Sequence, residues 1–187
     1  MEDSMSRSAS FVIGIIAGVV IVVPLGAYLF AKLGGIAMAT TAKPLPLEET
    51  FAQTALHASL GDAAKVQDPL SEDEANLLGG ARVYARNCAV CHGLPGQPKT
   101  AIARGEFPPP PQLFAPHEMV TDDPQGVTYW KVSHGIRLSG MPGFGSTLSD
   151  AERWQVTMLL ARADRLPSSV KASLARSASG ATPGEQP

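Results

Sequence analysis

Five consecutive residues, Cys88-Ala89-Val90-Cys91-His92, bring two thiols and one imidazole together. Two thiols at this spacing on a turn can add to the two vinyl groups of one haem, while the adjacent imidazole reaches the haem iron. The motif therefore predicts one covalently attached haem c.

The same cysteine spacing also occurs in half of a zinc site, in a redox-active dithiol and by chance. Zinc needs four ligands, and the chain has only these two cysteines. Its other histidines, His57, His117 and His134, form no pair at zinc-ligand spacing. A redox dithiol lacks the strand and helix context in which such pairs are found. Haem attachment is therefore the preferred interpretation.

A second axial ligand decides what the iron can do. A methionine thioether closes the iron and favours electron transfer, whereas a free face binds gases or peroxide. Met141 stands in the sequence Ser139-Gly140-Met141-Pro142-Gly143, where the glycines allow close approach and the proline stiffens the loop. We therefore expect His92 and Met141 to ligate the iron, with Met119 and then His134 as alternatives to Met141.

Three predicted helices position these residues. Two of them begin with a capping box, in which a serine and a glutamate three residues later bond the first turn: Ser71 with Glu74, and Ser149 with Glu152. The predicted helices cover residues 71–87, 125–135 and 150–163. Between the first two, residues 94–124 are dense in proline and predict a loop with little regular structure.

An apolar stretch precedes all of these elements. Residues 11–30 contain no charged side chain, and as a helix they reach about 30 Å, the thickness of the hydrocarbon core of a bilayer. We interpret residues 11–33 as an uncleaved transmembrane anchor after a cytoplasmic leader at residues 1–10. The alternative is a secretory signal cut after Ala39, although the apolar part of such signals is usually about 7 to 15 residues long. Both interpretations export the rest of the chain.

Composition divides the remaining chain into three parts. Residues 34–70 contain paired glycines and a Lys-Pro-Leu-Pro run, and predict a linker with one short helix. Residues 71–166 form the predicted helical domain. Residues 167–187 are rich in Ser, Ala, Gly and Pro and contain no aromatic residue, which predicts a disordered tail.

Charge and composition exclude several classes of protein. The net charge of −2 offers no broad attraction to nucleic acid. Two cysteines in one motif cannot staple distant segments, so a disulfide scaffold is excluded. The predicted domain has seven aromatic residues, which is few for a self-sufficient core of this size. A largely apolar macrocycle would complete that core.

With these residues assembled, segment 71–166 resembles the class I c-type cytochromes, in particular the membrane-anchored single-haem ones. The resemblance implies an all-α domain around a covalent haem, preceded here by one N-terminal transmembrane helix. It also implies thioethers at Cys88 and Cys91, with His92 as the proximal ligand. Gly80 and Tyr84 match the family's Gly-x-x-x-aromatic pattern on the first helix, where the glycine lets the last helix cross closely.

The resemblance extends to both loops. Pro111-Gln112-Leu113 resembles the family's Pro-x-Leu turn, which implies that the Pro111 carbonyl accepts the Nδ1 proton of His92 and that Leu113 packs on the ring. Residues 129–137 resemble the stretch before the methionine loop, so Trp130 or Arg137 is expected to contact a haem propionate. One departure is Leu159, where many members have an aromatic residue, whereas Trp154 lies earlier on the same helix.

The expected function is electron transfer without catalysis on a small-molecule substrate. The chain would be a single-pass protein of the inner (cytoplasmic) membrane with its haem domain on the periplasmic side. There it would carry one electron at a time from a quinol-oxidising complex or dehydrogenase to a terminal oxidase or reductase of a respiratory chain. Two alternatives remain open: a permanently bound haem c subunit of a larger oxidoreductase complex, and a haem enzyme or gas sensor with an open distal face.

Overall fold

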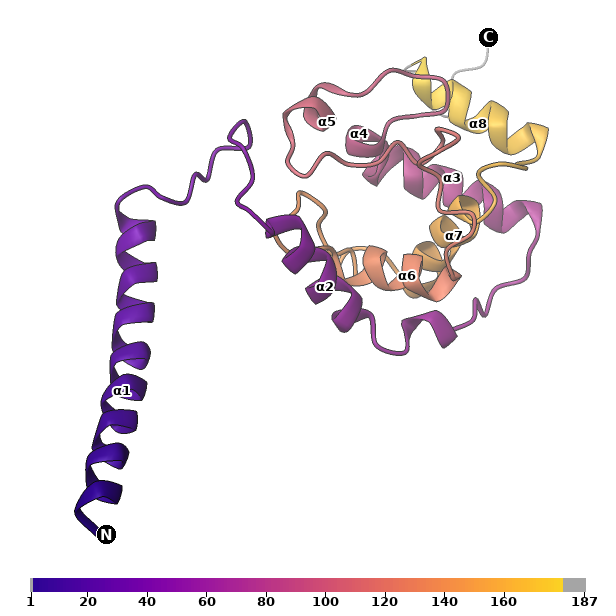
Figure 1. Cartoon of the computed structure of the whole chain (residues 1–187). Coiled ribbons are helices and arrows are strands. Elements are labelled where there is room, and N and C mark those ends of the chain that lie inside the picture. The colour runs from indigo at the N-terminus through magenta and orange to yellow at the C-terminus, as the bar shows by residue number, and fades with distance from the viewer. Residues whose placement is uncertain (1, 180–187) are drawn as a thin grey trace. The chain divides into compact units, whose positions relative to one another are not determined.

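The computed structural model describes residues 2–179, and this part of the chain contains helices but no strand. The all-α class predicted from the sequence is therefore confirmed. The chain divides into two compact units, residues 1–46 and residues 47–187. In chain order the helices are α1 (Glu2–Lys32), α2 (Glu48–Leu60), the 3-10 helix η1 (Ala63–Lys65), α3 (Glu74–Asn87), α4 (Ala89–His92), α5 (Ala101–Gly105), α6 (Gln125–His134), α7 (Asp150–Leu160) and α8 (Ser168–Ala178) (Figure 1).

The first unit consists of the long helix α1 and the segment that follows it. Within α1, Ala9–Lys32 is long and apolar enough to cross a membrane, with a mean hydropathy of 2.6. Its large apolar side chains, from Phe11 to Phe30, are exposed. Lipid would cover such a surface, because an exposed apolar helix of this length is unfavourable in water. This helix fits a single-pass membrane anchor.

Helices α3 and α7 of the second unit cross at a glycine. A Cβ atom added to Gly80 would lie 2.2 Å from the backbone oxygen of Gln155 and 3.0 Å from the Cβ atom of Leu159. No side chain larger than hydrogen fits there without moving α7. The close helix crossing that the resemblance implies is present, and the fully buried Leu159 takes the place of the usual aromatic residue.

Trp154 of α7 packs against α6 instead. Its ring stacks on the ring of Tyr129, with centroids 4.0 Å apart and planes 13° apart. The residue before Trp154, Arg153, lies over the Tyr129 ring at 5.2 Å and donates a hydrogen bond to Ser133 Oγ at 2.8 Å. These contacts fix α7 to α6, so that α7 is held by both α3 and α6.

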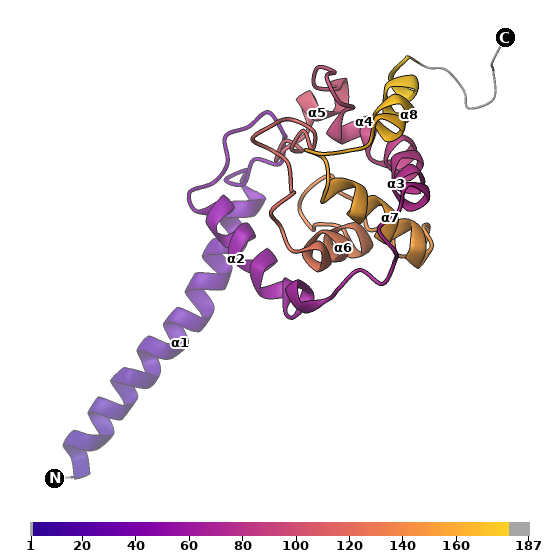
Figure 2. The ribbon, with the colours of Figure 1, turned by 90° about the vertical axis from the view of Figure 1, so that its right-hand side faces the viewer.

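Residues 168–178 differ from the disordered tail that the sequence predicts. They form α8, whose side chains Val170 and Leu174 are buried in the same core as Tyr84 of α3. Both views of the ribbon show α8 beside α3 (Figures 1 and 2). The prediction was wrong here because two apolar residues four apart suffice to make a stripe on a helix, and the average composition of the tail conceals them. The rest of the predicted tail, residues 180–187, lies outside the described residues.

The predicted linker contains ordered structure near its end. α2 forms where a short helix is predicted, and none of its side chains is buried. After it, η1 packs against the start of α6: a Cβ atom added to Gly126 would lie 2.0 Å from the carbonyl oxygen of Ala63. Residues 63–66 therefore touch the helical domain. The domain boundary at residue 71 stays a prediction.

The capping patterns agree with the structure at one of the two helices. Ser149 and Glu152 form a complete capping box at the start of α7. At α3 the N-cap is Asp73, whose carboxylate accepts a hydrogen bond from the Asn76 N–H at 2.9 Å. Ser71 donates to that carboxylate at 2.6 Å instead of capping the helix itself. The carboxylate is the stronger acceptor, and α3 therefore starts at Glu74.

Candidate haem site

A mostly apolar cavity lies in the second unit. Together with its open mouth it encloses about 1090 Å³. Six of the residues that line it were predicted from the sequence to bind the cofactor: Cys88, Cys91, His92, Pro111, Leu113 and Met141. Residues from three separate parts of the chain, the C-x-x-C-H motif, the proline-rich loop and the methionine loop, thus meet around one apolar space.

The C-x-x-C-H motif forms the single-turn helix α4, directly after α3. The backbone N–H of His92 donates to the Cys88 carbonyl at 2.9 Å, so that the turn brings the motif's side chains to the same cavity. The chain leaves α4 at Gly93, whose φ of 71° is a conformation that favours glycine. Tyr84 of α3 fixes that exit, because its hydroxyl donates to the Gly93 carbonyl at 2.7 Å. The motif is therefore connected to α3 at its start by the chain and at its end by the hydrogen bond from Tyr84.

The imidazole of His92 is oriented by the proline-rich loop. Its Nδ1 atom lies 2.8 Å from the carbonyl oxygen of Pro111, which is the hydrogen bond that the resemblance implies. A carbonyl oxygen can only accept, so this contact places the proton on Nδ1 and leaves the lone pair on Nε2. The next residue, Gln112, donates its backbone N–H to the carboxylate of Glu118. The Pro111 turn is thereby held in position, and Nε2 is available as a metal ligand.

The loop that carries Met141 is fastened to the end of α6. Ile136 donates its N–H to the Met141 carbonyl at 3.1 Å, and the Met141 N–H donates to Ser139 Oγ at 3.2 Å. Gly135 has a φ of 70°, and a Cβ atom there would lie 2.5 Å from the nitrogen of Gly143. Glycine at position 135 thus permits the loop to come close to the end of α6. Met141 itself is half-buried and lines the cavity.

Other sequence candidates do not line the cavity. Met119, Trp130, His134 and Arg137 are absent from its wall. His134 is exposed, its Nδ1 lies 2.9 Å from the Trp130 carbonyl oxygen, and its ring stacks on Trp130 with centroids 4.7 Å apart. Neither Met119 nor His134 therefore gains support as an alternative to Met141. The contact of Trp130 or Arg137 with a haem propionate stays a prediction.

The surroundings of the two thiols do not favour metal binding by thiolates or redox chemistry. Both cysteines are free, and burial, with a smaller contribution from Cys91, raises the pKa of Cys88 to about 12. Burial and then the charge of Glu106 raise the pKa of Cys91. Redox-active and metal-binding cysteines need accessible thiolates. Among the described residues no cluster of three or more His, Cys, Asp or Glu side chains is arranged to hold a metal ion.

Sequence reasoning missed the charged side chains in the cavity wall. Glu106 follows α5, and its Oε2 atom is buried without a hydrogen-bond partner. Lys131 of α6 lies 3.4 Å from the carboxylate of Asp123. Glu106 belongs to no recognisable motif, and Lys131 lies in the 129–137 stretch of the resemblance but was given no role there. Only the folding of the proline-rich loop and α6 around the cavity brings them to it.

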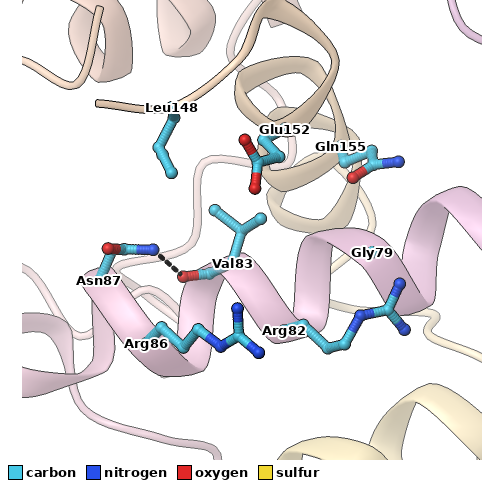
Figure 3. Close-up of a pocket in the computed structure, with 8 residues that line it drawn as sticks. All are labelled: Gly79, Arg82, Val83, Arg86, Asn87, Leu148, Glu152 and Gln155. Atoms are coloured by element: carbon cyan, nitrogen blue, oxygen red, sulfur yellow. Dashed lines mark hydrogen bonds between the residues drawn. The ribbon is translucent and has the colours of Figure 1, made fainter. Parts of the chain in front are cut away.

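A second groove lies between α3 and α7 and has a different character (Figure 3). It is lined by polar side chains that include Arg82, Arg86 and Gln155. Glu152 points from α7 toward α3, and its carboxylate accepts hydrogen bonds from the backbone N–H and hydroxyl of Ser149. No thiol, thioether or imidazole lines this groove. The potential haem ligands therefore meet at the apolar cavity and not here.

Comparison with known proteins identifies the domain. A family model described as cytochrome C oxidase, cbb3-type, subunit III matches residues 75–158, slightly less than half of the chain. The match includes the C-x-x-C-H motif, both loops of the cavity and most of α7. Neither the curated proteins nor the solved structures contain a match to this chain. The motif, the apolar cavity and the family match agree, and the chain contains a c-type cytochrome domain that carries covalently bound haem c.

Proposed function

We propose that the chain is a membrane-tethered electron carrier whose haem c is held by Cys88, Cys91, His92 and Met141. One observation carries the proposal: two thiols, an imidazole with its Nδ1 hydrogen-bonded, and a methionine line one mostly apolar cavity. When bound between imidazole and thioether ligands, haem iron takes up and releases one electron by cycling between its ferric and ferrous states.

The residues around the cavity have separate tasks. Cys88 and Cys91 would hold the haem through two thioether bonds, each formed by addition of a thiol S–H across one vinyl group. His92 offers Nε2 to the iron, and its bond to the Pro111 carbonyl increases the basicity of the ring. Met141 offers its sulfur from a loop that is fastened to α6. The apolar wall keeps water away, which favours electron transfer over ligand exchange.

The partners of this carrier would be redox proteins of a respiratory chain. We propose that α1 anchors the chain in the inner membrane with the haem domain on the periplasmic side. A quinol-oxidising complex or a dehydrogenase would supply the electron, and a terminal oxidase or reductase would accept it. A reporter enzyme fused after residue 187 tests this orientation. Activity only of a cytoplasmic reporter would contradict it.

A second candidate is a haem c subunit that stays bound to an oxidase. Two observations favour it: the matching family model describes an oxidase subunit, and residues 63–66 pack against α6, which shortens any flexible tether. Purification of the full chain from membranes in mild detergent separates the candidates. A fixed subunit co-purifies with an oxidase in constant ratio, whereas a carrier is recovered on its own.

Optical spectra of the full haem-loaded chain test the ligand set. Met141→Ala is expected to remove the long-wavelength absorption band that a thioether ligand gives ferric haem, and Met119→Ala is the control that retains it. An unchanged spectrum in Met141→Ala would contradict the assignment. Rapid binding of carbon monoxide by the reduced wild-type chain would favour the enzyme or sensor with an open distal face.

A further inference from the structure

One acidic side chain stands in the wall of the haem cavity. Glu106 directly follows α5, and it is half-buried. Its Oε2 atom is buried and accepts no hydrogen bond from any of the described residues. In residues 2–179 no lysine, arginine or histidine forms an ion pair with it. A buried carboxylate oxygen without a partner is uncommon in folded proteins, so the position of Glu106 needs a physical explanation.

Two contacts place this carboxylate beside both attachment points of the haem. On one side it lies beside Cys91 in the cavity wall, where burial and then the charge of Glu106 raise the pKa of the thiol. On the other side its Oε1 atom lies against Gly140, where an added Cβ atom would be only 1.1 Å from that oxygen. Gly140 directly precedes Met141 in the chain. Glu106 therefore lies between the second thioether position and the loop of the methionine ligand.

Attachment of the haem changes the surroundings of Glu106. A thioether sulfur carries no proton, so Cys91 cannot donate a hydrogen bond to the carboxylate once the haem is attached. The negative charge then remains in a mostly apolar wall, near an iron whose charge falls by one on reduction. A nearby negative charge stabilises the more positive ferric state more than the ferrous state.

We propose that Glu106 lowers the midpoint potential of the haem by presenting its carboxylate to the cavity between Cys91 and Gly140. Glu106 tunes the iron without ligating it, and the proposal rests on the haem site proposed above. An adjacent charge shifts an ionisation equilibrium by about 10- to 1000-fold, and a half-exposed carboxylate belongs at the lower end because water screens it. Removal of the charge is therefore expected to favour reduction about tenfold, which corresponds to about 59 mV for one electron.

Redox titration of the full haem-loaded chain tests the proposal. Glu106→Gln keeps the size of the side chain and removes its charge, and is expected to raise the potential by the amount given above. The haem content and the optical spectrum should stay those of the wild type. Glu74→Gln is the matched control, because Glu74 is exposed in the first turn of α3 and does not line the cavity. Its potential should not change.

A second variant tests the position of the carboxylate. In Gly140→Ala the new Cβ atom must displace the Glu106 side chain, so the potential is expected to rise. In a Glu106→Gln background the same substitution should change the potential little, because the two effects act through one charge. An equal rise in both backgrounds counts against the proposal.

Three outcomes separate this proposal from the ligand assignment. An unchanged or lower potential in Glu106→Gln with normal haem content overturns the role of Glu106. Loss of covalent haem in both Glu106→Gln and Glu106→Ala also overturns it, because the residue would then serve attachment. A wild-type spectrum without thioether ligation overturns the proposed ligand set, and it does so without any variant of Glu106.

Discussion

Tyr84 and Gly93 connect the core of the domain to its haem motif. The Tyr84 side chain is completely buried, and its hydroxyl donates to the Gly93 carbonyl at 2.7 Å. Its ring also meets Phe114 of the proline-rich loop edge to face, with centroids 5.0 Å apart. One residue of α3 thus contacts both the end of the C-x-x-C-H helix and the loop that orients His92. The packing of the helices therefore also sets the geometry of the site.

Tyr84→Phe is expected to destabilise the domain while leaving haem attachment intact. The substitution keeps the ring but leaves the buried Gly93 carbonyl without its partner, which costs about 1 to 3 kcal/mol. Unfolding of the haem-loaded chain by guanidinium measures this loss. Tyr129→Phe is the control: its hydroxyl bonds to Asp150 near the surface, where water can replace it, so the loss should be smaller. Equal stability of Tyr84→Phe and wild type would contradict the expectation.

Gly80→Ala is expected to force α3 and α7 apart. The added methyl group would meet the backbone of Gln155, which cannot rotate away, and overpacking of this kind costs about 1 to 3 kcal/mol. Gly105→Ala is the matched control, because nothing lies within 4 Å of its added Cβ atom. Thermal unfolding should show a lower midpoint for the Gly80 variant only. If both variants unfold at the same temperature, the close approach of α3 and α7 at Gly80 does not contribute to the stability of the domain.

Removal of α8 is expected to weaken the core. A chain that ends at Pro167 loses Val170 and Leu174, which are 0% and 1% exposed. Each such side chain stabilises the fold by about 1.5 to 3 kcal/mol, so about 3 to 6 kcal/mol of unfolding free energy should disappear. A chain that ends at Ser179 keeps α8 and is the control. Similar stability of the two truncated chains would support the disordered tail that the composition predicts.

The sequence predicted the residues that bind the haem better than it predicted the residues and helices around them. Spacing rules apply to residues that are close in the chain, so the C-x-x-C-H motif, the anchor and the Ser149 capping box could be found directly. The Pro111 turn and Met141 needed the resemblance or the flanking glycines, because each comes to the cavity from a distant loop. The structure brings both to the cavity beside His92.

The features that were missed depend on contacts between distant residues. Glu106 has no motif, and only the path of the proline-rich loop brings it beside Cys91. α8 was hidden by its average composition, although its apolar stripe packs in the core. Asp73 took over the cap of α3 from Ser71 because a carboxylate was available. Contacts between distant residues place Glu106 and stabilise α8, and competition between two neighbouring side chains sets the N-cap of α3. Spacing rules along the sequence describe neither effect.

Glu118→Ala is expected to loosen the turn that orients His92. The carboxylate of Glu118 accepts the N–H of Gln112, directly after Pro111, and a hydrogen bond to a charged group contributes about 1.5 to 3 kcal/mol. A less firmly held Pro111 carbonyl also makes the imidazole less basic, so the haem potential should rise. Glu118→Gln retains an acceptor and should be affected less in both measurements. Unchanged stability and potential in Glu118→Ala would show that the Pro111 turn keeps its conformation without the hydrogen bond from Gln112 to Glu118.

Ser149→Ala is expected to destabilise α7 in a way that depends on pH. The Ser149 hydroxyl and then its backbone N–H hold the pKa of Glu152 below its ordinary value. A carboxyl group whose pKa is lower in the folded state contributes stability above its unfolded pKa of about 4.5, and this contribution is lost as the pH falls through the folded value. The difference in unfolding midpoint between wild type and Ser149→Ala should therefore be largest near neutral pH and shrink in acid. It should not vanish, since the Ser149 hydroxyl still accepts the Glu152 N–H. Ser146→Ala, an exposed position three residues earlier, is the control, and a difference that grows in acid would contradict the expected sign.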